Sequence, residues 1–141
     1  MNDSVENKCR HLLFIVCSLL LLSACATTAS KKSEIEERVM GRWDKVLSGD
    51  LAAAYTYLSP GTRSSVSSMD YQRSILTQRV AWTGARYIRS ECEESACKVK
   101  LSIDYVVNGA VPGIKSFKGV SEIEESWVLI DGTWYMVPLK L

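Results

Sequence analysis

Histidine is nearly absent from this chain, because His11 is the only one among its 141 residues. A zinc site is usually built from several cysteine and histidine ligands, so we expect no metal and no cofactor. The charges also nearly cancel, and the formal net charge is +1. Proteins that bind nucleic acid usually carry a basic patch, so nucleic acid is not an expected partner. The chain also lacks a recognisable nucleophile motif.

A long hydrophobic run is missing as well. The longest apolar segment, Leu12–Leu22, is shorter than the roughly 20 residues that a transmembrane helix needs. Lys8 and Arg10 precede this segment, and small residues follow it, which is the layout of a secretory signal peptide. An uncleaved signal anchor is the alternative interpretation. The sequence therefore predicts an exported protein.

The end of the apolar segment, Leu22-Ser23-Ala24-Cys25, resembles the lipobox of bacterial lipoproteins. This resemblance implies a signal peptide at 1–24 and a lipid on the thiol of Cys25. The small and polar segment that follows predicts a lipidated N-terminus and flexible tether at 25–33, and a single domain at 34–141. Ala26 follows the cysteine where an inner-membrane retention signal would have aspartate. We therefore expect a lipid anchor on the periplasmic face of the outer membrane.

Cys92 and Cys97 are the two cysteines that remain in the expected domain apart from the lipid site. They flank a four-residue segment of turn-like composition, Glu93–Ala96. In an oxidising compartment, such a pair indicates a disulfide across a hairpin tip. The only histidine lies in the segment expected to be removed, so a zinc site at these cysteines is disfavoured.

The first part of the domain has the apolar period of helices. Apolar residues recur at helical spacing from Ser33 to Leu47, with charged residues such as Arg42 assigned to the opposite side. Gly49 and Asp50 predict a corner into a second helix, which runs from about Leu51 to Leu58 and is ended by Ser59-Pro60-Gly61. A third helix is expected after Ser67, which has the capping residues for one.

Beyond Val80 the apolar period changes to two, which predicts strands. The segment from Cys97 to Val107 alternates between apolar and polar residues, as a half-buried strand does. Asp131-Gly132 is a strong hairpin signal. It predicts cross-strand pairs of Leu129 with Trp134 and of Trp127 with Met136. The expected fold is α+β, with N-terminal helices packed on one face of a curved antiparallel sheet of about four strands.

Several of these features together resemble bacterial lipoproteins with a nuclear transport factor 2-like domain. The features are Gly49-Asp50-Leu51, Ala54-Tyr55, Leu58-Ser59-Pro60, Arg63, Tyr71, Cys92, Cys97 and the hairpin from Trp127 to Tyr135. The resemblance implies a sheet wrapped around a long first helix, forming a cone whose open end often holds a pocket. Such proteins include steroid isomerases, polyketide cyclases, dehydratases and binding modules without catalytic activity.

Aromatic residues and one acidic residue are the candidates for lining such a pocket. They are Trp43, Tyr55, Tyr71, Trp82, Tyr105, Glu125, Trp127 and Trp134. Core packing is the alternative role for the aromatic residues, because aromatics dominate burial in small domains. Strict alternation places Glu125 on the face of Trp127, whereas a bulge, common in long curved strands, would turn Glu125 to solvent. We favour the exposed position.

The expected function is that of a non-catalytic binding or accessory module, anchored to the membrane through its N-terminal lipid. Its partner would be a small apolar ligand or another envelope protein. One alternative is an enzyme of the isomerase or polyketide-cyclase type, which would need a base beside a group that holds an oxyanion. The other is a structural subunit of an envelope assembly.

Overall fold

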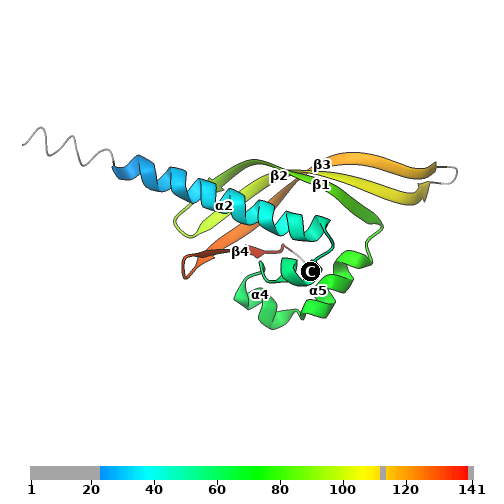
Figure 1. The fold of residues 1–141 in the computed structure, drawn as a ribbon, viewed down its shortest axis with the longest axis horizontal. Coiled ribbons are helices and arrows are strands. Elements are labelled where there is room, and N and C mark those ends of the chain that lie inside the picture. Colours follow the sequence, from blue (N-terminus) through cyan, green and yellow to red (C-terminus); the bar gives the residue numbers. More distant parts are fainter. Residues whose placement is uncertain (1–22, 112–113, 140–141) are drawn as a thin grey trace, which may run out of the picture. The chain divides into compact units, whose positions relative to one another are not determined.

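The computed structural model describes residues 23–111 and 114–139, and it has helices first and strands afterwards (Figure 1). The helices are α2 (Ser23–Leu47), α3 (Leu51–Tyr55), α4 (Pro60–Ser65) and α5 (Ser68–Leu76). The strands are β1 (Val80–Cys92), β2 (Ala96–Val111), β3 (Ile114–Ile130) and β4 (Thr133–Val137). They form one antiparallel, open sheet in the order β1-β2-β3-β4. The expected α+β class with four strands is confirmed.

The chain divides into two compact units, Met1–Glu34 and Ile35–Leu141. Helix α2 already begins at Ser23, so the segment 25–33, expected to be a flexible tether, is helical. This segment contains neither glycine nor proline, the residues that interrupt helices most strongly, so its composition allows a helix. Most of the expected signal peptide lies outside the described residues. Within the described part of the chain, no helix has the length and apolar character needed to cross a membrane.

The corner between α2 and α3 follows the expected capping chemistry. Gly49 takes the left-handed conformation with φ +79° after α2, where a residue without Cβ is favoured. The side chain of Asp50 then accepts a hydrogen bond from the Ala53 amide at 3.2 Å and caps α3. Ser67 caps α5 in the same way, through a hydrogen bond from the Asp70 amide at 3.1 Å.

The segment after α3 differs from the sequence-based expectation. Helix α3 ends at Tyr55 instead of reaching Leu58, because the backbone there pairs with β4. The Met136 amide donates to the Tyr57 carbonyl at 2.8 Å, and the Ser59 amide donates to the Met136 carbonyl at 2.9 Å. Ser59 then caps the additional short helix α4. This bridge fastens the helical layer to the edge strand of the sheet.

Strand β2 shows the alternation expected from its sequence. The residues of one face are buried, namely Cys97, Val99, Leu101 and Ile103. The opposite face carries Lys98 and Lys100, whose ammonium groups lie 3.7 and 3.8 Å from carboxylates of β3. The Asp131-Gly132 turn has positive φ at both residues, as a tight hairpin turn requires. It pairs Leu129 with Trp134 and Trp127 with Met136, as predicted.

The hydrophobic core lies between the inner face of the sheet and the helices. Its largest fully buried side chains are Trp127, Ile35, Leu58, Leu101, Val39 and Val99. Ile35 and Val39 come from α2, so the part of this helix inside the second unit packs on the sheet. The expected disulfide is confirmed at the β1–β2 hairpin tip, where Cys92 and Cys97 are bonded and their Cα atoms lie 4.1 Å apart.

Candidate functional site

A hollow of about 280 Å³ opens between α2, the inner face of the sheet and the segment that follows β4. Its apolar wall includes Trp43 from α2, Trp82 from β1, Ile103 from β2 and Ile123 from β3. Trp43 and Trp82 meet edge to face, with ring centroids 5.5 Å apart. Ligand sites are usually concave and mostly apolar, with a few polar groups in fixed positions. This hollow has that composition.

The polar part of the wall is a buried ion pair. Arg42 and Glu125 are each 5% exposed, and both line the hollow. The Arg42 Nη1 donates to Glu125 Oε1 at 2.9 Å. A buried charge is tolerated when it is paired and hydrogen-bonded, and this pair joins α2 to β3.

Further donors complete the shell of the carboxylate. The indole Nε1 of Trp43 donates to Glu125 Oε1 at 3.1 Å, and that of Trp127 donates to Oε2 at 3.0 Å. On the other side of the pair, Arg42 Nη2 donates to the Tyr71 hydroxyl at 3.4 Å. Both oxygens of Glu125 therefore accept hydrogen bonds from protein donors, which hold this carboxylate in a fixed position.

The alternation of β3 explains the position of Glu125. The pairing of β2 with β3 is regular from Ala96 to Asn108, so Glu125 shares the inner face with Trp127. The favoured exposed position of Glu125 is wrong, because the bulge on which it depended is absent from this stretch of the β2–β3 ladder.

The sequence analysis places Arg42 on the outer face of its helix, but the structure places it on the inner face. The spacing of residues in the sequence indicates this inner position. Arg42 stands seven residues after Ile35 and three after Val39, which is the spacing of one helix face. The assignment to the outer face followed its charge instead of its spacing. A burial this deep requires a partner, and that partner, Glu125, lies 83 residues away in the sequence.

The structure separates the residues proposed for the pocket into groups. Trp43, Trp82 and Glu125 line the hollow. Trp127 and Tyr71 contact the ion pair behind it. The other three lie apart from this hollow, namely Tyr55, Tyr105 and Trp134. Tyr55 donates its hydroxyl to the carbonyls of Arg63 and Val66, and Trp134 is a core residue.

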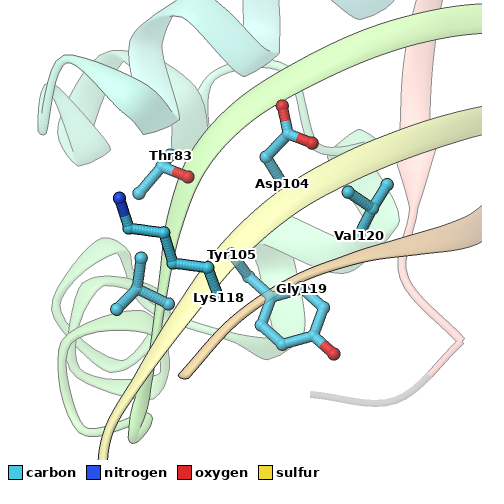
Figure 2. Close-up of a pocket in the computed structure, with 7 residues that line it drawn as sticks. Thr83, Asp104, Tyr105, Lys118, Gly119 and Val120 are labelled. Atoms are coloured by element: carbon cyan, nitrogen blue, oxygen red, sulfur yellow. The ribbon is translucent and has the colours of Figure 1, made fainter. Parts of the chain in front are cut away.

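Tyr105 lines a second hollow, of about 340 Å³, across β1, β2 and β3 (Figure 2). Its ring lies over Gly119 of the neighbouring strand, where an added Cβ would come within 2.6 Å of the ring carbon Cζ. Asp104 also lines this hollow, and Arg86 holds it through contacts of 2.6 and 2.9 Å. The hydrogen bond from Arg86 lowers the pKa of Asp104 below its usual value. Surface strand residues form this second hollow, and it has no buried polar group.

Acidic, cysteine and histidine side chains do not gather in groups of three or more that could hold a metal ion anywhere in the described part of the chain. The first hollow is lined by two carboxylates: Glu125, which is bound to Arg42, and Glu124, whose Oε1 lies 3.7 Å from the ammonium group of Lys98.

Comparison with known proteins bears on the fold. No protein-family model matches this chain, and no curated protein matches it. The chain is similar to the solution structure of a SEC-C motif containing protein from Rhodopseudomonas palustris, with a TM-score of 0.56 and 12% sequence identity. The match covers 72% of this chain and 73% of that one. At this level of identity, the likeness concerns the fold alone.

This match overturns the resemblance to lipoproteins with a nuclear transport factor 2-like domain. The features that suggested it were helix caps, turn residues and a hairpin, which many chains with helices before an antiparallel sheet can share. The chain is an α+β protein whose helices are followed by an open antiparallel sheet of four strands, with a fold similar to that of a SEC-C motif containing protein.

Proposed function

We propose that this chain is a lipid-anchored envelope protein whose domain binds a small apolar ligand without transforming it. The observation that carries the proposal is the hollow between Trp43 and Trp82, whose wall is mostly apolar. Its polar members are Glu124 and Ser126, together with the paired Arg42 and Glu125. Because the two charges neutralise each other, a neutral ligand fits better than an ion. The volume of about 280 Å³ lies just below the range of about 300–1,000 Å³ for ligand sites, so the ligand would be small.

The geometry supports binding over catalysis. A general base must reach its ligand, whereas Glu125 is 5% exposed and both of its oxygens already accept hydrogen bonds, from Arg42, Trp43 and Trp127. An enzyme that used this carboxylate would have to break a buried ion pair in each turnover. If the protein were only a structural subunit, the hollow would bind no ligand. The binding experiment below therefore also distinguishes this alternative from a binding module.

Binding is tested by titrating the full chain in neutral detergent with naphthalene, a small apolar probe, while following the indole N–H resonances by NMR. The resonances of Trp43 and Trp82 should shift saturably, whereas that of Trp134, outside the hollow, should stay in place. Site-specific signals matter here because the probe also enters the micelles.

A pair of matched variants tests the location of the ligand. Ile123→Trp puts a larger side chain into the hollow and should abolish the saturable shifts. Ile88→Trp makes the same exchange on an exposed position of β1 and should leave them unchanged. Equal behaviour of the two variants, or no saturable shift at all, contradicts the binding proposal. Turnover of a bound compound that Glu125→Gln abolishes would contradict its non-catalytic part.

The membrane anchor is proposed on the lipobox-like segment that ends at Cys25. Acylation there places the domain on the periplasmic face of the outer membrane. Mass spectrometry of the natively expressed protein should find a lipid mass increment on the peptide that begins with Cys25, and Cys25→Ser should release the protein from membranes or leave it unprocessed. A peptide without the increment in the wild type refutes the anchor.

A further inference from the structure

Two arginines flank one tyrosine ring at the edge strand β4. The guanidinium carbon of Arg38, on α2, lies 5.9 Å from the ring centroid of Tyr135. That of Arg63, on α4, lies 5.9 Å from the same centroid. The two guanidinium carbons are therefore no more than about 12 Å apart. Three separate elements bring these positive groups together.

Other residues hold the side chain of Arg38 and the backbone of Arg63 in place. Arg38 stacks on Tyr57, with 4.0 Å between its guanidinium carbon and the ring centroid, and its Nε donates to the Trp134 carbonyl at 3.0 Å. The backbone carbonyl of Arg63 accepts a hydrogen bond from the Tyr55 hydroxyl at 3.1 Å. The contacts of Arg38 position its side chain, whereas that of Arg63 positions its backbone, and none of them neutralises a guanidinium group.

Within the described part of the chain, neither cation has an acidic partner. Among residues 33–108 and 116–139, every ion pair involves other basic side chains. Arg63 is half-buried, and its Nε is buried without any hydrogen-bond acceptor in the described part of the chain. A buried donor without a partner is costly, and two neighbouring unpaired cations repel each other. An anion in contact with both guanidinium groups would offset this repulsion.

We propose that Arg38 and Arg63 bind a phosphate group at the β4 edge. Guanidinium groups are planar forks that match phosphate oxygens in pairs, and charge-assisted hydrogen bonds of this kind are short and strong. A phosphate carries enough acceptor oxygens to engage both forks at once, which a single carboxylate does less well. The phosphate comes either from a lipid headgroup or from the free ion.

This phosphate site is separate from the hollow. Neither arginine lines the hollow, whose charged pair consists of Arg42 and Glu125. A domain with both sites would hold an apolar molecule at one place and an anion at another. Either proposal can therefore be refuted without affecting the other.

The experiment titrates the full chain in neutral detergent with inorganic phosphate and, separately, with glycerophosphoglycerol, the soluble headgroup of phosphatidylglycerol. The readout is the Nε–H resonance of Arg38 and of Arg63. Both should shift saturably, and Arg63→Gln should weaken the binding by about tenfold or more. The matched control is Arg73→Gln, which removes an equal charge from an exposed site where Arg73 pairs with Asp70 at 3.2 Å. It should leave the affinity unchanged.

The two ligands distinguish the source of the phosphate. Tighter binding of inorganic phosphate supports the free ion, and tighter binding of glycerophosphoglycerol supports a lipid headgroup. If Arg63→Gln does not fold, Arg63→Lys takes its place in the test. This variant keeps the positive charge but loses the planar guanidinium group, so it should bind phosphate several-fold more weakly than the wild type. The proposal is overturned if neither compound causes saturable shifts, if Arg73→Gln loses as much affinity as the Arg63 variants, or if acetate binds as well as phosphate.

Discussion

The ion pair between Arg42 and Glu125 gives the sharpest test of this structure. Glu125→Gln keeps the size of the side chain but removes its charge, so Arg42 would remain buried at 5% exposure without a counter-ion. The amide has one accepting oxygen where the carboxylate has two, so it cannot accept from both Trp43 and Trp127 in the present arrangement. Breaking a buried pair in this way costs about 3–5 kcal/mol of unfolding free energy.

The assay is urea-induced unfolding of the full chain, followed by tryptophan fluorescence and by circular dichroism. The matched control is Glu122→Gln, which breaks the exposed pair with Lys100 at 3.8 Å and should cost at most about 1 kcal/mol. Arg42→Met should cost as much as Glu125→Gln. The double variant should cost less than the sum of the two single variants, by about 0.5–3 kcal/mol, because it leaves no unpaired charge.

Two results would refute this reasoning. The first is a loss in Glu125→Gln no larger than that in Glu122→Gln, which would mean that the carboxylate is not buried against Arg42. The second is strict additivity in the double variant, which would mean that the two side chains do not interact. Either result would also remove the polar wall from the proposed ligand site.

The remaining predictions concern the sheet. Gly119→Ala should lower the unfolding free energy by about 0.5–1.5 kcal/mol, because its Cβ would meet the tip of the Tyr105 ring at 2.6 Å and the ring would have to turn aside. Tyr105→Ala should remove this penalty in the double variant, and an unchanged midpoint in Gly119→Ala alone would contradict the close approach. The carboxyl group of Asp104 should titrate below its usual pKa in an NMR experiment and return toward it in Arg86→Gln. Since the pKa of Asp104 is lowered in the folded state, this pair should stabilise the protein at pH values above the unfolded-state pKa of about 3.9. The stabilisation should vanish as the pH falls through the folded-state pKa. If the pKa of Asp104 were the same in Arg86→Gln, this prediction would be contradicted. Reduction of the disulfide at the β1–β2 hairpin tip should lower the unfolding free energy by about 2 kcal/mol and keep the far-ultraviolet circular dichroism spectrum; global unfolding on reduction would be the contrary outcome.

Local patterns in the sequence were sufficient for much of the fold. The Asp131-Gly132 turn sets the register of the last hairpin, because a two-residue loop allows only one set of cross-strand partners. The alternation from Cys97 to Ile103 determines which face of β2 is buried. In these places the information lies within a few residues, so the order of residues alone predicts the result.

Such local patterns did not predict the fold family or the full length of the first helix. The family resemblance rested on caps and turns and was wrong, since those signals specify local geometry and not the curvature or closure of a sheet. The extension of α2 back to Ser23 was missed because polar composition was taken to indicate a tether, whereas the absence of helix breakers allows a helix.

The candidate site was decided almost entirely by the tertiary structure. The sequence alone placed Trp43 on the inner face of its helix and left Glu125 open to either face of its strand. Only the packing of α2 on the sheet brings Arg42 to within 2.9 Å of Glu125 and closes the hollow beside Trp82. The physical reason is that a buried charge is stable only with a partner, and that partner comes from an element whose position depends on the packing of the whole domain.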